Sequence, residues 1–240
     1  MARAAVLGRL NWRVASVAEF VDETPRTRTL VLNVDGWPGH RAGQHVDVRL
    51  TAEDGYQAER SYSIASGPSN GKLELTVELI EDGEVSPYLV GEARHGDTFE
   101  VRGPIGGWFA WDPAQGGPLL LVGGGSGVVP LRSMLRARPP DVSARLIYSA
   151  RTLEDVIYRN ELEALGDDVV LTLTREQRDG FHTGRVDADL LREAGVPPAQ
   201  EPRIFVCGPT PFVESVASEL VALGHPAERV RTERFGPTGR

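Results

Sequence analysis

The chain has 240 residues, of which 40% are hydrophobic and 25% are charged, and its formal net charge is −8. These values are typical of a soluble globular protein of one or two domains, and the negative charge argues against nucleic-acid or anionic-membrane binding. Neither an apolar stretch near the roughly 20 residues that span a bilayer nor a signal-peptide pattern is found, so we expect a cytoplasmic protein.

The cysteine and histidine content limits the metal chemistry of these residues. Cys207 is the single cysteine, which excludes a disulfide framework and a cysteine-ligated iron–sulfur cluster within the 240 residues, because such a cluster needs several thiolates. The closest histidines, His40 and His45, lack metal-binding spacing. We therefore predict no metal site.

Short runs of alternating apolar and polar residues fill residues 12–101, with Gly, Asp and Asn between the runs. Residues 45–50 and 73–79 alternate most cleanly. This period of two predicts an antiparallel barrel or sandwich with one buried face. Residues 86–93 could form one short helix inside it.

The pattern changes after Gly103-Pro104. Residues 118–122 are a continuous apolar run, which is typical of a strand covered on both faces. Further buried strands are expected at 144–148, 169–173 and 204–206, with helices at 128–138, 153–165, 186–193 and 211–223. This alternation predicts a parallel sheet wound with helices. Because Asp, Pro, Gln and Gly cluster at 111–117, we expect two domains, 1–112 and 113–240.

The run Arg60-Ser61-Tyr62-Ser63 has two interpretations. It could be a strand edge with an exposed Arg and a half-buried Tyr. Alternatively, the guanidinium suits a phosphate, the aromatic ring can stack on a flat heterocycle, and the hydroxyl can form a hydrogen bond with it. Downstream, the Gly83–Ser86 turn precedes a helix start at which Ser86 is a good N-cap, and free backbone N–H groups there suit a diphosphate.

A glycine-rich turn, 123–130, follows the first buried strand. It reads Gly125-x-Gly127-x-x-Pro130, with Pro where the Rossmann fingerprint has its third Gly, and such glycines let backbone N–H groups approach a pyrophosphate. A turn without a ligand is the alternative. Cys207-Gly208-Pro209 ends a later strand, and a lone cysteine there is commonly a core residue.

In this order and at this spacing, the motifs resemble the ferredoxin–NADP⁺ reductase family of flavoproteins, from about Trp12 to the last few residues. The resemblance implies an antiparallel six-stranded β-barrel that binds FAD rather than FMN. A parallel, Rossmann-like α/β domain that binds a nicotinamide dinucleotide would follow. Hydride would pass from the nicotinamide to the flavin.

The resemblance also implies individual site residues. Those at the reacting atoms would be Ser63, Cys207, Glu233 and Phe235. Those at the flavin would be Arg60, Ser61, Tyr62, Ser63, Val77, Leu79, Gly83, Val85, Ser86 and Phe235. Those at the nicotinamide dinucleotide would be Gly124, Gly125, Ser126, Gly127, Pro130, Ser149, Arg151, Thr174, Arg175, Cys207, Gly208 and Pro209. The C-terminus departs from the plant-type pattern, since Phe235 replaces a tyrosine and five residues follow it.

The sequence indicates the choice of nicotinamide coenzyme and the electron acceptor less strongly than it indicates the two cofactor-binding domains. Thr174-Arg175-Glu176-Gln177 looks like the Ser-Arg-Glu-Gln that holds the 2′-phosphate in plant-type members, so we favour NADPH, with NADH possible. The expected acceptor is a separate ferredoxin or flavodoxin. Reduction of a free flavin, quinone, haem or molybdenum partner is an alternative, as is an electron-transfer or regulatory subunit of a larger complex. Arginines near the two ends could form a basic docking patch: Arg3, Arg9, Arg13, Arg229, Arg231, Arg234 and Arg240.

Overall fold

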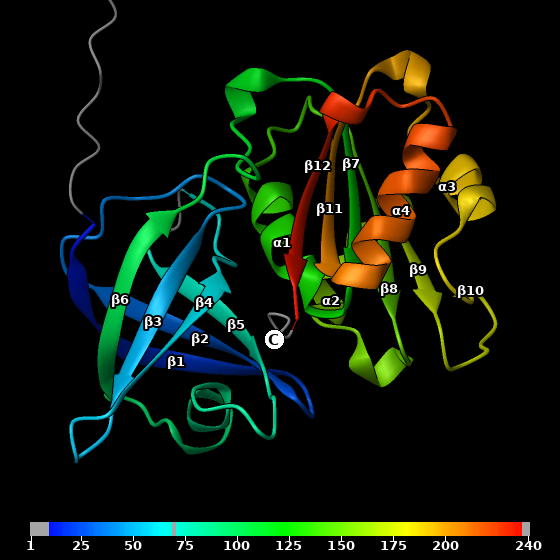
Figure 1. The fold of residues 1–240 in the computed structure, drawn as a ribbon. Coiled ribbons are helices and arrows are strands. Elements are labelled where there is room, and N and C mark those ends of the chain that lie inside the picture. The colour runs from blue at the N-terminus through cyan, green and yellow to red at the C-terminus, as the bar shows by residue number, and fades with distance from the viewer. Residues whose placement is uncertain (1–9, 69–70, 237–240) are drawn as a thin grey trace, which may run out of the picture.

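The computed structural model describes residues 10–68 and 71–236, which form two units (Figure 1). The first unit is a six-stranded antiparallel sheet in the order β4-β3-β6-β1-β2-β5. Its strands are β1 (Trp12–Thr24), β2 (Thr27–Val34), β3 (His45–Thr51), β4 (Gln57–Ser63), β5 (Leu73–Glu78) and β6 (Thr98–Ile105). A single helical turn, Tyr88–Glu92, lies between β5 and β6.

The sheet of the first unit curls, so that its two edge strands meet. An antiparallel bridge joins Ile64, just after β4, to Leu75 of β5, and Ala65 N donates to Glu74 O at 2.8 Å. Alternate side chains from all six strands fill the interior, among them the fully buried Leu30 and Val48. The period-two alternation therefore produces one buried and one outward face, and the predicted antiparallel barrel is confirmed.

The second unit is a six-stranded parallel sheet in the order β10-β9-β8-β7-β11-β12. Its strands are β7 (Leu119–Gly124), β8 (Ala144–Ala150), β9 (Val169–Leu173), β10 (His182–Thr183), β11 (Arg203–Pro209) and β12 (Val230–Phe235). Its helices are α1 (Val128–Ala137), α2 (Arg159–Glu163), α3 (Ala188–Ala194) and α4 (Thr210–Ala222).

Both faces of the parallel sheet are covered, which explains the uninterrupted apolar run of β7. Leu119 and Leu121 pack in a core with α1 and α2, whereas Leu120 and Val122 pack with α3 and α4. Figure 1 shows α1 on the side of the sheet that faces the barrel, with α3 and α4 on the other side. The predicted α/β domain is confirmed.

Two segments differ from the sequence prediction. The helix expected at 153–165 is split into a 3₁₀ turn, Leu153–Asp155, and the short α2, because Tyr158 takes a left-handed conformation with φ of 61°. Residues 230–235, for which no strand is predicted, form strand β12 at the edge of the sheet. Within the described ranges, no helix combines the length and the apolar character required to cross a membrane.

Candidate functional site

The glycine turn lies at the centre of the parallel sheet. β7 is flanked by β8 on one side and β11 on the other, so the strand order reverses at its carboxyl end, where open α/β sheets bind their ligands. A Cβ on Gly127 would lie 2.1 Å from the Cys207 carbonyl oxygen, so only glycine allows this close approach of the turn to β11. Gly125 has φ of 55° and open space beside it.

The residues predicted at the reacting atoms from the α/β domain come together at this edge. Cys207 of β11 pairs with Gly123 on one side and with Glu233 of β12 on the other, and Phe235 pairs with Pro209. Burial, and secondarily the Glu233 carboxylate, raises the pKa of the Cys207 thiol well above its ordinary value. Burial raises the pKa of Glu233 to about 7.

A cleft of about 300 Å³ opens beside these residues and is lined from both units. The parallel domain contributes the glycine turn and the loops that follow β8, β9 and β11. The lining residues of that domain are Gly124, Gly125, Ser126, Ser149, Ala150, Arg151, Asp155, Ile157, Thr174, Pro209, Phe212 and Phe235. The barrel contributes Thr24, Arg26, Thr27 and Glu78.

The residues predicted for the 2′-phosphate are neighbours in space. Thr174 N donates to Ala150 O at 3.0 Å, and Arg175 N donates to Arg151 O at 2.8 Å, so the loops after β8 and β9 are held together. Ser149, Arg151 and Thr174 line the cleft. Arg151 and Arg175, both exposed, thus stand on adjoining segments, and Arg151 lines the cleft.

Two barrel segments predicted to bind FAD also meet, although they are distant in sequence. Arg60 of β4 forms a 2.6 Å ion pair with Glu84, which belongs to the turn before the Tyr88–Glu92 helix. Both side chains are about half exposed, at 52% and 44%, so a phosphate could replace Glu84 at small cost. The donor set fits a phosphate, because a half-exposed guanidinium stands beside the turn that precedes the helix.

Because neighbouring side chains of β4 point to opposite faces of the sheet, the adjacent residues predicted at the flavin do not all share one face. Tyr62 is partly buried beside Val46, and this burial raises the pKa of its hydroxyl. Ser61 points to the opposite face, where its hydroxyl donates to Asp47 at 2.7 Å. Ser63, opposite His45, is the last residue of the strand. Any contact of Ser61 with a cofactor would therefore involve its backbone.

The Ser86 hydroxyl does not cap the following helix as predicted. It accepts a hydrogen bond from Ile80 N at 3.0 Å and so closes the turn before the helix. Val77 and Val85 are fully buried in the barrel, and Leu79 follows β5, with its N–H bonded to Arg26 O. Because the side chains of Val77, Val85 and Ser86 are buried, only their backbone groups, and those of Gly83, remain for cofactor contacts, whereas the Leu79 side chain is partly exposed.

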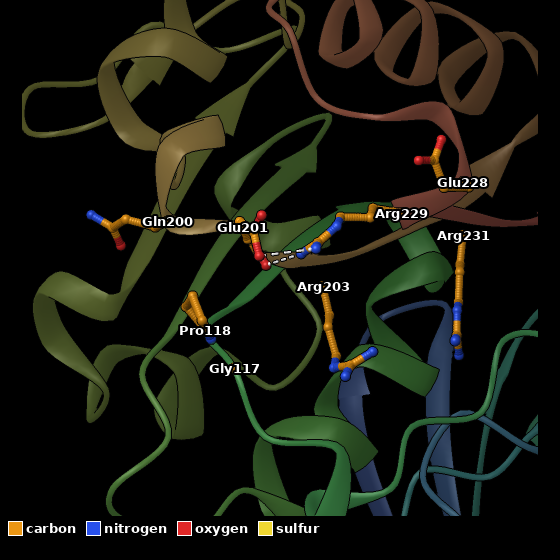
Figure 2. A pocket seen from close by; sticks show the side chains of 8 residues that line it. All are labelled: Gly117, Pro118, Gln200, Glu201, Arg203, Glu228, Arg229 and Arg231. Atoms are coloured by element: carbon orange, nitrogen blue, oxygen red, sulfur yellow. Dashed lines mark hydrogen bonds and ion pairs between the residues drawn. The ribbon is translucent and has the colours of Figure 1, made fainter.

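A second cleft, of about 430 Å³, lies at the opposite, amino-terminal edge of the parallel sheet (Figure 2). Its arginines bind neighbouring loops: Arg203 donates to Gln115 and Gly116 carbonyls, and Arg229 pairs with Glu201 at 3.0 Å. Arg231, in β12, and Arg229, just before it, precede Phe235 by four and six residues, or about 13 and 20 Å of extended strand, so a carrier docked on them would be far from the reacting edge. Arg3, Arg9 and Arg240 lie outside the described residues.

Two family models match the two units. The oxidoreductase FAD-binding domain matches residues 16–109, and the oxidoreductase NAD-binding domain matches residues 121–218. A curated relative, ferredoxin–NADP reductase B of Sorangium cellulosum, is 39% identical over 81% of this chain and 84% of its own length. The chain belongs to the ferredoxin–NADP⁺ reductase family. It therefore carries the FAD-binding and NAD-binding domains of a flavin-dependent NAD(P)H oxidoreductase.

Some relatives are longer than this chain, whereas others match it over nearly their whole length. NADH oxidoreductase HCR of Escherichia coli is 34% identical over 89% of the chain, which spans 65% of that protein. Among solved structures, the Amycolatopsis cytochrome P450 reductase GcoB superposes with a TM-score of 0.84 at 26% identity, covering 96% of this chain and 71% of that one. A Neisseria gonorrhoeae ferredoxin NADP⁺ reductase has a TM-score of 0.80 at 22% identity, with coverage of 93% and 98%, and supports the fold.

Sequence reasoning did not identify the barrel residues of the cleft. Arg26, Thr27 and Glu78 are brought there by the pairing of β2 with β5, in which Thr27 lies opposite Glu78. Their local sequence carries no ligand motif. The regular alternation of 73–79 was the only available signal, because it assigns Glu78 to the outward face of its strand.

Proposed function

We propose that this chain transfers hydride from NADPH to FAD and then passes single electrons to a separate carrier such as a ferredoxin or flavodoxin. The observation that carries the proposal is the cleft at the carboxyl edge of the parallel sheet. There the glycine turn and Phe235 face residues of the flavin-binding barrel. When bound, FAD would supply the hydride-accepting and single-electron chemistry.

The protein's own residues would bind and orient the two cofactors. Arg60 and the backbone around Ser86 would hold the FAD diphosphate, and the Tyr62 ring would lie against the flavin. Cys207 is too deeply buried for a nucleophile and would shape the nicotinamide site. Phe235 would cover the opposite ring face and exclude water. We place the division between the FAD and NAD(P) domains at residues 112 and 113.

The preference for NADPH is supported by two exposed arginines on the loops that follow β8 and β9. Arg151 and Arg175 lie on segments joined by a backbone hydrogen bond and can both reach a phosphate at the adenine ribose. Arg151→Gln combined with Arg175→Gln is expected to raise KM for NADPH strongly and KM for NADH little.

The proposed acceptor is supported by the reductase of Sorangium cellulosum, which this chain spans at 84% of its length. A role as the reductase of an oxygenase is a second candidate. The glycine betaine monooxygenase reductase subunit of Chromohalobacter salexigens is 35% identical over 96% of the chain, which covers 65% of that protein.

An anaerobic titration tests the proposal. The purified yellow protein is titrated separately with NADPH and with NADH, and bleaching of the flavin absorbance is followed. Oxidised ferredoxin, flavodoxin, free flavin and a quinone are then added in separate experiments. Stoichiometric bleaching followed by reoxidation with ferredoxin or flavodoxin is expected. A colourless protein that takes up no FAD, or flavin that neither nucleotide reduces, would refute the proposed function.

A further inference from the structure

Two cationic and two anionic side chains line the cleft in which the dinucleotide would bind. Its charged lining residues are Arg26 and Glu78 from the barrel and Arg151 and Asp155 from the parallel domain. The two carboxylates would repel a pyrophosphate, which carries two negative charges. Cations in the cleft would offset this repulsion, and the lining offers two of them, Arg151 after β8 and Arg26 on the barrel.

Arg26 is held at the barrel side of the cleft by its own hairpin. It occupies the two-residue turn between β1 and β2, and its carbonyl accepts from Leu79 N at 2.8 Å. The guanidinium donates to Leu79 O at 3.1 Å. In Figure 1 the dark-blue tip of this hairpin extends toward the carboxyl ends of the parallel strands, consistent with Arg26 and Gly124–Ser126 lining the same cleft.

The partner that now neutralises Arg26 is easily replaced. Its 2.8 Å ion pair with Glu81 joins side chains that are 48% and 73% exposed. Exposed ion pairs of this kind contribute about 0–1 kcal/mol, whereas a guanidinium binds a phosphate through two parallel, charge-assisted hydrogen bonds. Arg26 can therefore exchange Glu81 for a phosphate without leaving its backbone anchor.

We propose that Arg26 binds the pyrophosphate of NAD(P)H from the barrel side, opposite the glycine turn. This inference rests on the proposed function, since it assigns a residue to the same cleft. The dinucleotide would then be held between a cation of one domain and backbone N–H groups of the other. Because NADH and NADPH share the pyrophosphate, Arg26 would strengthen the binding of both dinucleotides equally. A residue that recognises the 2′-phosphate would strengthen the binding of NADPH alone.

Calorimetric binding to the FAD-loaded protein tests this assignment without turnover. ADP-ribose carries the pyrophosphate but neither nicotinamide nor 2′-phosphate, and 2′-AMP carries the 2′-phosphate alone. In Arg26→Gln we expect the Kd of ADP-ribose, NADH and NADPH to rise by a common factor of about ten, with the Kd of 2′-AMP unchanged. The matched control is Arg28→Gln, on the same hairpin, whose Nε pairs with Asp22 outside the cleft.

The variant Glu81→Gln separates a direct role from a structural one. If Arg26 contacts the ligand, freeing it from Glu81 leaves ADP-ribose binding at least as tight as in the wild type. Weakened binding in Glu81→Gln would overturn the proposal, as would wild-type affinity in Arg26→Gln or a loss confined to NADPH. A wild-type flavin that neither nucleotide reduces would refute the proposed function, while the ADP-ribose titration would still decide the role of Arg26.

Discussion

Cys207 lies directly opposite Glu233 in the parallel pairing of β11 with β12, so a buried thiol and a partly buried carboxyl group share the carboxyl edge of the sheet. Burial raises the pKa of both groups, but only that of Glu233, at about 7, lies near neutrality. The thiol stays protonated under ordinary conditions. Changes in charge at this edge near neutral pH therefore come from the carboxyl group.

Glu233 is expected to make stability depend on pH. Its pKa is about 7 in the folded protein against an ordinary value of 4.5, so between these pH values the folded state holds a proton that the unfolded chain has released. The free energy of unfolding should therefore fall as pH rises from about 4.5 to about 7, by up to about 3 kcal/mol. In Glu233→Gln this slope should disappear, and the protein should be more stable above pH 7.

Urea unfolding of the holoprotein at pH 5 and pH 8 measures this effect. Glu228→Gln, at an exposed position just before β12, serves as the control and should keep the wild-type slope. A Glu233→Gln variant that loses as much stability as the wild type between the two pH values would contradict the prediction.

Cys207 is expected to resist thiol reagents in the folded protein. Its side chain is 2% exposed, and burial raises its pKa well above the ordinary value, so little thiolate is available. Incubation with a chromogenic disulfide reagent at pH 7.5 should release almost no colour until denaturant is added, and then one equivalent. Rapid reaction of the native protein would show that the β11 end opens in solution.

Much of the fold follows from local sequence patterns, while the elements that were missed depend on tertiary contacts. The alternation at 45–50 and the apolar run at 118–122 correspond to β3 and β7. By contrast, β12 carries four charged or polar residues, and its pairing with β11, rather than an apolar pattern, holds it in place. The break at Tyr158 has no glycine or proline to mark it.

The residues of the site also divide into those that a local sequence pattern indicates and those that only tertiary contacts bring together. The glycine turn could be found because close backbone approach leaves a signature in residue type, whereas Cys207 was expected at the site only through the family resemblance. Arg26 and Glu78 could not, because antiparallel pairing and domain packing, rather than spacing along the chain, bring them to the cleft. Sequence reasoning also could not foresee that Glu84 pairs with Arg60, since this contact depends on how the two loops fold together.

The contact between the two domains should depend more on Arg132 than on Arg136. Both guanidiniums bridge Glu74 of β5 and Glu161 of α2, at 2.8–2.9 Å. The Arg132 side chain is only 8% exposed, against 28% for Arg136, and it also stacks 4.0 Å over the Tyr158 ring. We expect Arg132→Met to lower the free energy of unfolding by about 3 kcal/mol and Arg136→Met by about 1 kcal/mol. Chemical denaturation of both variants measures this, and equal losses would contradict it.

The Tyr62 ring, rather than its hydroxyl, is expected to retain FAD. The ring is partly buried against the barrel core, and burial raises the pKa of the hydroxyl, which therefore stays neutral. Tyr62→Phe preserves the stacking surface and should bind FAD within about twofold of the wild type. Tyr62→Ala removes it and should raise the Kd for FAD about tenfold or more, since aromatic stacking adds about 1 kcal/mol to the effect of lost apolar contact. Fluorescence recovery on FAD release gives the Kd, and far-ultraviolet circular dichroism checks that both variants fold. Equal affinity of the two folded variants would remove Tyr62 from the flavin site.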